Sequence, residues 1–310
     1  MPKGNLAAID LGSNSCRLLI TTAEGMPIYR KSTTTKLAEG LHSSKKFTNE
    51  AIERGFKCLA EYAKTMQEYG VTDYRAIATA SCRMAQNGAD FVKAVEELCG
   101  IHLDIITSAE EAILNVKGAR LNADEDKKYV LVYDLGGGST EITLATNNSE
   151  PEIIYTISIP WGARNAAEAY GLLEYDEEKA TALKTEIHKY TKEFLDNSGF
   201  AEYREKCEFI ATSSTPLRLV SMSRGLGGYN RHDVDGVAER IGELDKQIAK
   251  IRKMNFIQAA ENPYIGENRA VIFQAACTIF KTIYDDLGIK ILTASLKGAQ
   301  EAIINELVQK

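Results

Sequence analysis

Two stretches of this chain share one pattern: Ile9-Asp10-Leu11-Gly12-Ser13-Asn14-Ser15 and, 124 residues later (134 minus 10), Tyr133-Asp134-Leu135-Gly136-Gly137-Gly138-Ser139. In both, an apolar run ends at an aspartate, passes through a glycine-bearing turn and continues into a second strand-like run, at 16–21 and 140–144. The pattern predicts two β-hairpins with acidic tips. Because the same device occurs twice, we expect a duplicated domain.

A second pair of segments supports the duplication. The sequence AIATAS at 76–81 resembles FIATSS at 209–214, at an offset of 133 (209 minus 76). Two similarities in the same order and at similar offsets are what two copies of one domain would leave behind.

Alternating strand and helix patterns indicate an α/β fold. Apolar residues at spacings of three and four predict helices at 48–69 and 89–99, and strands are expected at 74–79 and 103–106. Such alternation favours a mainly parallel sheet covered by helices on both faces. The polar segment 122–128 is the best linker candidate, directly before the second hairpin.

Composition narrows the class of protein. The 310 residues are 44% apolar and 26% charged, which is typical of compact globular cores. A net charge of −6 argues against binding a nucleic acid polymer, and no apolar stretch is long enough to span a membrane. Six cysteines without C-x-x-C spacing favour reduced, buried thiols. We therefore expect a soluble, leaderless, cytoplasmic protein that holds any anionic substrate with local donors and a metal.

Five segments together resemble the exopolyphosphatase / guanosine pentaphosphate phosphohydrolase (Ppx/GppA) family, in its short two-domain form. The opening segment at 9–19 and the Asp-Leu-Gly-Gly-Gly-Ser-Thr-Glu segment at 134–141 are the more specific ones. The other three are Ala78-Thr79-Ala80-Ser81-Cys82-Arg83, Ser108-Ala109-Glu110-Glu111-Ala112 and Ile159-Pro160-Trp161-Gly162-Ala163.

The resemblance implies a duplicated ribonuclease H-like (actin-like ATPase) fold with the active site in the cleft between domains. It places the last helix in the first domain, so we expect domains of 1–121 plus 296–310 and of 122–295. It also implies hydrolysis of a terminal phosphoanhydride, with Mg²⁺ or alternatively Mn²⁺ as cofactor. Inorganic polyphosphate or guanosine pentaphosphate is the implied substrate, and a homodimer the implied assembly.

The glycine-bearing turns are the candidate phosphate-binding loops. Glycine permits close approach of a ligand, and successive N–H groups can turn inward to bind an anion. The alternative is that the glycines serve only the turns themselves. The candidate residues are Gly12, Ser13, Asn14, Ser15, Arg17, Gly136, Gly137, Gly138, Ser139 and Thr140.

Asp134 and Asp10 are the candidate metal ligands. Magnesium prefers one or two carboxylates together with waters and substrate oxygens. The resemblance favours Asp134 on the metal side. An Asx turn at the end of each strand is the alternative for both residues.

Glu111, Arg83 and Glu141 are the candidate catalytic residues. The resemblance assigns Glu111 to the attacking water, while Ser108-x-x-Glu111 also fits a helix capping box. Arg83, like Arg17, matches a phosphate-contacting arginine but could form a surface ion pair instead. Glu141 is either a site residue or a solvated strand position.

The sequence also departs from the family pattern. Where the family has Gly-Gly-Thr, this chain has Thr212-Ser213-Ser214-Thr215-Pro216, which weakens the case for a guanosine nucleotide. A Leu-Arg-Glu-Gly segment is replaced by Ala299-Gln300-Glu301-Ala302, and Arg-Ala-Asp by Arg269-Ala270-Val271. Two functions therefore stay open beside polyphosphate hydrolysis: guanosine pentaphosphate 5′-phosphohydrolase, and a non-catalytic nucleotide or phosphate sensor. His232-Asp233 lacks partner ligands and is expected to be a turn.

Overall fold

A computed structural model describes residues 4–310, which form two compact units. Unit 1 consists of the described residues up to Leu114 together with Ala299–Lys310, and unit 2 is Asn115–Gly298. Residues 1–3 of the first expected domain lie outside the described part. The first boundary falls inside helix α5 (Ser108–Ala119) and not after residue 121, because the last turns of that helix pack into the core of unit 2. The second boundary falls after residue 298 and not after residue 295.

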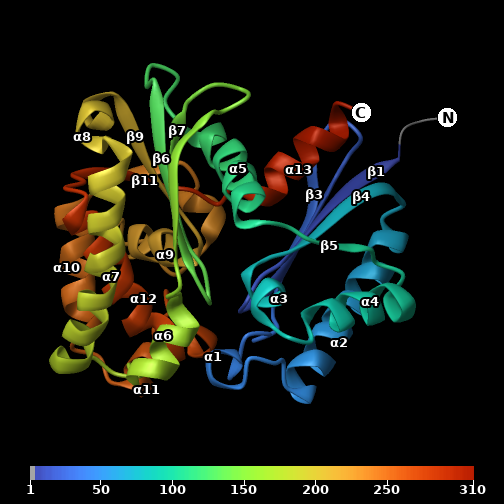
Figure 1. Cartoon of the computed structure of the whole chain (residues 1–310), viewed down its shortest axis with the longest axis horizontal. Helices are drawn as coiled ribbons and strands as arrows, with labels where there is room; N and C mark the ends of the chain where they lie inside the picture. Colours follow the sequence, from blue (N-terminus) through green and yellow to red (C-terminus); the bar gives the residue numbers. More distant parts are fainter. Residues whose placement is uncertain (1–3) are drawn as a thin grey trace. The chain divides into compact units, whose positions relative to one another are not determined.

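Unit 1 is built on a five-stranded sheet in the order β3-β2-β1-β4-β5 (Figure 1). The predicted hairpin is present, with antiparallel β1 and β2, and β3 pairs antiparallel to β2; β4 and β5 extend the sheet in parallel on the other side of β1. The strands are β1 (Asn5–Leu11), β2 (Ser15–Thr21), β3 (Pro27–Thr34), β4 (Val71–Ala78) and β5 (Leu103–Ile105).

Helices cover both faces of this sheet. On one face α2 (Asn49–Glu68) and α4 (Gly88–Cys99) bury their apolar stripes against alternate residues of β1, β2 and β4. On the other face α13 (Ala299–Val308) packs on the remaining residues of the same strands. The Thr48 hydroxyl caps α2 by accepting the Ala51 N–H, as expected where a helix starts. Two short helices complete the unit, α1 (Leu41–Ser44) and α3 (Ala80–Met84).

Unit 2 contains a six-stranded sheet in the order β10-β11-β9-β6-β7-β8. Its antiparallel hairpin β6–β7 is the second predicted hairpin, β8 continues it, and β9 runs parallel to β6 on the other side. The strands are β6 (Tyr129–Leu135), β7 (Thr140–Thr146), β8 (Ile153–Ile159), β9 (Cys207–Thr212), β10 (Val237–Arg240) and β11 (Ile291–Ala294).

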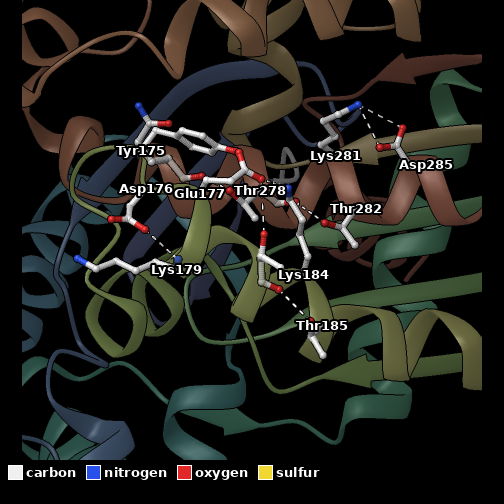
Figure 2. A network of polar contacts seen from close by, with 12 residues as sticks. Tyr175, Asp176, Glu177, Lys179, Lys184, Thr185, Thr278, Lys281, Thr282 and Asp285 are labelled. Atoms are coloured by element: carbon white, nitrogen blue, oxygen red, sulfur yellow. Dashed lines mark hydrogen bonds and ion pairs between the residues drawn. The ribbon is translucent and has the colours of Figure 1, made fainter.

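The larger core of unit 2 lies under a group of helices dominated by α7 (Glu177–Ser198) and α12 (Glu267–Asp286). Figure 2 shows the polar contacts at the start of α7, where the Asp176 carboxylate caps the helix by accepting the Lys179 N–H. The second face is covered by the end of α5, through Val116 and Ala119. The other helices are α6 (Ala163–Tyr170), α8 (Phe200–Tyr203), α9 (Ser214–Ser223), α10 (Ile241–Ile251) and α11 (Phe256–Glu261), with 3₁₀ turns η1 (Arg120–Asn122), η2 (Arg204–Lys206) and η3 (Arg231–Val234).

The two sheets share one topology. The order β3-β2-β1-β4-β5 in unit 1 corresponds to β8-β7-β6-β9-β11 in unit 2, and unit 2 adds the edge strand β10. The chain is therefore a duplicated ribonuclease H-like fold of the actin-like kind, as expected. The sequence analysis did not predict β10, α3 or α6, each of which spans eight residues or fewer.

Three further expectations concern cysteines, the His-Asp pair and membranes. All six cysteines are free thiols, and five of them are buried. His232 and Asp233 lie in the short turn η3, as expected for that segment. Within residues 4–310, no helix combines the length and apolar composition needed to cross a membrane.

Candidate active site

The two hairpin turns have the same backbone geometry. The Gly12 N–H donates to the Ser15 carbonyl at 3.1 Å, and the Gly136 N–H donates to the Ser139 carbonyl at 3.0 Å. The strand registers also correspond, with Leu11 opposite Cys16 and Leu135 opposite Thr140. The duplication inferred from sequence therefore extends to the details of the turn.

The first turn, Gly12 to Ser15, is held through its carbonyl oxygens. The Ser13 carbonyl accepts the Ala38 N–H at 2.9 Å, and the Asn14 carbonyl accepts the N–H groups of Thr35 and Lys36 at 3.0 Å each. In the part of the chain that the structure describes, the Ser13 N–H has no backbone acceptor. Outward carbonyls and an inward N–H are the arrangement that binds an anion.

The second turn, Gly136 to Ser139, is held in the same way by the start of α6. The Gly136 carbonyl accepts the Ala163 N–H at 2.9 Å, and the Gly137 carbonyl accepts the Arg164 N–H at 2.8 Å. The Gly138 carbonyl accepts the side-chain amide of Asn165 at 2.9 Å. Among residues 4–310, nothing accepts a hydrogen bond from the N–H groups of Gly137 and Gly138. This turn therefore presents at least two backbone donors.

Gly162 lies directly against the second turn. A Cβ atom at this position would be 2.5 Å from the Gly137 carbonyl carbon and 2.6 Å from the Gly138 nitrogen. Only glycine lets α6 begin close enough to make the hydrogen bonds that hold the turn.

The acidic residues of the two hairpins lie in different electrostatic surroundings. Asp10 is directly opposite Arg17 across the strands, and the two side chains form an ion pair at 3.2 Å. At the equivalent position of unit 2, Asp134 is directly opposite a second acid, Glu141. Glu141 is only 5% exposed, so the interpretation of a solvated strand position is wrong.

Two neutral side chains donate hydrogen bonds to this acid pair. The Asn115 amide donates to Asp134 Oδ2 at 3.3 Å, and the Ser158 hydroxyl donates to Glu141 Oε1 at 3.0 Å. On the far side of Asp134, strand β9 places Thr212 in register with it, on the face that α5 covers. Thr212 is 5% exposed, and its hydroxyl has no hydrogen-bond partner among the described residues.

Glu111 forms an ion pair with Arg83 in unit 1. Arg83 Nη1 lies 2.7 Å from Glu111 Oε2 and also donates to the Ile106 carbonyl at 2.9 Å. The capping-box alternative for Glu111 is wrong by one residue, because the Thr107 hydroxyl caps α5 by accepting the Glu110 N–H at 3.2 Å. Glu111 as a whole is 8% exposed. Its carboxylate is thus held by a guanidinium and not by the helix cap.

Cysteine chemistry is not available beside these residues. Burial raises the pKa of the Cys82 thiol to about 12 and that of Cys16 well above its ordinary value. Both thiols stay protonated near neutral pH, and the thiolate is the reactive form.

The carboxylates fit a divalent cation only as a pair. Within residues 4–310, no group of three or more His, Cys, Asp or Glu side chains is placed to hold a metal ion. Magnesium needs only one or two carboxylates when waters and phosphate oxygens complete its coordination. Asp134 and Glu141 supply that number, whereas the Asp10 carboxylate is engaged by Arg17.

Comparison with known proteins identifies the family. Residues 20–310 match the Ppx/GppA phosphatase family. The chain belongs to the Ppx/GppA phosphatase family. Its fold is shared by an exopolyphosphatase-like protein at 22% identity and a TM-score of 0.87, covering 98% of this chain and 99% of that one. An exopolyphosphatase from Cytophaga hutchinsonii is 17% identical with a TM-score of 0.88, covering 98% of both chains. The Aquifex aeolicus family member is 21% identical with a TM-score of 0.78, covering 99% of this chain and 98% of that one.

The Ppx/GppA segments predicted from sequence occupy comparable places in the two units. The end of the first hairpin carries Asp10, Arg17 and the loop between them. The end of the second hairpin carries the segment from Gly136 to Glu141. The Thr140 hydroxyl donates to the Trp161 carbonyl at 2.7 Å, so its proton anchors the segment before α6. Their roles in binding and catalysis stay predictions.

Sequence reasoning did not identify four residues that shape these groups: Asn115, Ser158, Gly162 and Asn165. Asn115 follows Glu111 by one turn of α5, a spacing that could have drawn attention to it. No local pattern reveals the other three. Ser158 depends on the strand register, and Gly162 and Asn165 depend on the close approach of α6 to the second turn.

Proposed function

We propose that this Ppx/GppA phosphatase is an exopolyphosphatase that removes terminal orthophosphate from inorganic polyphosphate. The observation that carries the proposal is the pair of matched turns, in which other residues bind the carbonyl oxygens and the N–H groups of Ser13, Gly137 and Gly138 donate to no backbone carbonyl among the described residues. A phosphoanhydride substrate spreads negative charge over its oxygens in the transition state, so fixed donors stabilise it.

Glu111 is the proposed general base for the attacking water. Arg83 fixes the orientation of its carboxylate through the 2.7 Å ion pair. A guanidinium has five N–H donors, so the contacts to Glu111 and Ile106 leave donors for a phosphate group.

Asp134 and Glu141 are the proposed ligands of Mg²⁺, with Mn²⁺ as the alternative ion. When bound, the cation would neutralise charge on the phosphate oxygens. The two carboxylates lie opposite each other on one face, and each accepts a hydrogen bond from a neutral side chain, Asp134 from Asn115 and Glu141 from Ser158.

The segment after β9 favours polyphosphate over guanosine pentaphosphate. Ser213 has φ +81° and ψ −179°, a conformation that is nearly restricted to glycine. Side chains of Thr215 and Pro216 are buried beside it. The family pattern has glycines in this segment, whereas this chain has residues with side chains. These side chains make it less favourable for a nucleoside to come close to the backbone.

A phosphate-release assay with a matched pair of variants tests the proposal. Polyphosphate with Mg²⁺ should release orthophosphate, and Glu111→Gln should lower kcat by about two to four orders of magnitude. Glu110→Gln is the control, because Glu110 is adjacent but pairs with Arg75. Equal loss in both variants would remove the assigned role of Glu111.

Substrate choice is tested with the same preparation. A higher kcat/KM for guanosine pentaphosphate than for polyphosphate would contradict the polyphosphate assignment. Tight binding of either compound without phosphate release would contradict catalysis and favour a sensor.

A further inference from the structure

The acid pair of unit 2 is oriented by neutral donors on two different elements. Asn115 reaches Asp134 from helix α5, and Ser158 reaches Glu141 from strand β8, where the register places it directly opposite. Amide and hydroxyl groups can fix a carboxylate without cancelling its charge. These two contacts therefore orient the carboxylates without themselves adding a positive charge, and a divalent cation requires oriented ligands.

Asn115 is the more firmly held of the two donors. It is 8% exposed, whereas Ser158 is solvent-exposed. The next residue of α5, Val116, is fully buried against Val130 and Val132 of strand β6. The side chain thus projects from a rigid helix that packs on the same strand that carries Asp134.

A close backbone crossing limits how Asn115 can move. A Cβ added to Gly298 would lie 3.5 Å from Asn115 Oδ1, and one added to Gly118 would lie 1.8 Å from the Gly298 carbonyl oxygen. The chain at Gly298 therefore passes against α5 within the same unit, beside the Asn115 amide. This contact restricts the rotamers by which the amide could leave Asp134.

We propose that Asn115 is a positioning residue that holds the Asp134 carboxylate in the orientation needed to bind a divalent cation. The inference rests on the proposed function, since it assumes that the Asp134 and Glu141 pair binds the metal. Donors that orient metal ligands affect the affinity for the ion, and removing one typically costs about 10- to 100-fold. Ser158 has the same type of contact to Glu141, but water can replace an exposed hydroxyl, so its contribution is smaller.

The test measures Mn²⁺ binding to the full chain without substrate, by titration calorimetry. Asn115→Leu keeps a similar volume but cannot donate, and should weaken Mn²⁺ binding by about 10- to 100-fold. Ser158→Ala should weaken it by about two- to threefold. Asn122→Leu is the matched control, because the Asn122 amide also donates to an aspartate, Asp235, at 2.6 Å in the same unit.

A second measurement separates positioning from general structural damage. In the Asn115→Leu enzyme, the Mg²⁺ concentration that gives half-maximal phosphate release should rise 10- to 100-fold, while kcat at saturating Mg²⁺ returns to within about threefold. If the leucine variant does not fold, Asn115→Ala is used with the same criteria.

The outcomes distinguish this inference from the function on which it rests. Equal Mn²⁺ affinity of the wild-type and Asn115 variants would overturn the role of Asn115 and leave the exopolyphosphatase proposal intact. Equal weakening by Asn115→Leu and Asn122→Leu would overturn it as well. Absence of Mn²⁺ binding in the wild type would instead overturn the metal assignment of the acid pair itself.

Discussion

The two hairpins of this protein share a backbone and differ in charge. Their turns close with the same hydrogen bond, at 3.1 Å in the first and 3.0 Å in the second. At the same register position the first hairpin opposes Asp10 with Arg17, and the second opposes Asp134 with Glu141. The aspartate is thus paired with a positive charge in the first hairpin and with a second acidic residue in the second hairpin. The two copies therefore share the geometry of the turn and differ in the charge beside it.

A doubled acid has a cost that needs an explanation. Like charges directly opposite on one face of a sheet are destabilising. Glu141 is 5% exposed, so water screens this pair poorly. A bound divalent cation would remove the repulsion, and this is the physical reason to assign the metal to the second hairpin.

The strand that runs parallel to each hairpin also differs in polarity between the two units. Strand β4 places apolar Ile77 beside Asp10, whereas strand β9 places Thr212 beside Asp134. The row of polar residues therefore continues from the hairpin onto the parallel neighbour β9 in unit 2, whereas in unit 1 it ends at β1.

The largest effect is expected from making the second hairpin resemble the first. Glu141→Arg would place a guanidinium opposite Asp134, as Arg17 lies opposite Asp10, and would oppose cation binding. We expect kcat for phosphate release to fall by about two to three orders of magnitude, because the electrostatic stabilisation of the transition state is lost. Steady-state kinetics at saturating Mg²⁺ provide the measurement.

Glu152→Arg is the control for that substitution. Glu152 precedes β8 and is exposed, so the change in net charge is the same at a position away from the acid pair. If the Glu141 variant kept activity within tenfold of this control, the charge difference between the hairpins would have no catalytic meaning.

A smaller loss is expected when the support of the second turn is disturbed. Gly162→Ala would put a methyl group 2.5 Å from the backbone of Gly137, so α6 must move away from the turn. Displacing a positioned group by about 1 Å can cost about 100-fold in rate, and we expect a loss of that order in kcat/KM.

The matched control for this change is Gly242→Ala in α10, where an added Cβ meets nothing within 4 Å. Phosphate-release kinetics and thermal unfolding should be followed together in both variants. Wild-type kinetics in the Gly162 variant would show that the close approach of α6 does not position the turn.

The sequence predicted the duplicated pattern because hairpins, caps and helical periods are local signals. Both hairpins and helix α2 lie within two residues of the expected bounds. It could not predict the domain boundary inside α5, because that depends on which core Val116 and Ala119 join after folding. Asn115 was missed for the same reason, since its contact with Asp134 links residues from a helix and a strand.

The alternative cap for α5 was one residue away from the observed one. Ser108-x-x-Glu111 satisfies the capping-box pattern, yet Thr107 is the residue whose hydroxyl accepts a free helix N–H. A shift of one residue moves Glu111 from the cap to the ion pair with Arg83. Both alternatives were compatible with the sequence, and only the three-dimensional position of Arg83 separates them.

The smallest effect is expected where the strand after each hairpin ends. Ser213 in unit 2 has φ +81°, whereas its counterpart in unit 1, Ala80, begins helix α3 without a positive φ. Ser213→Gly should therefore stabilise the protein by about 1 kcal/mol, since strain in this region costs roughly 1–3 kcal/mol and glycine loses more chain entropy on folding. Ala80→Gly should destabilise it by about 0.5–1 kcal/mol, because it gains only flexibility. Denaturant unfolding at equilibrium measures both changes. Destabilisation by both substitutions would mean that Ser213 is not strained, and the two copies would then differ in charge but not in stored backbone energy.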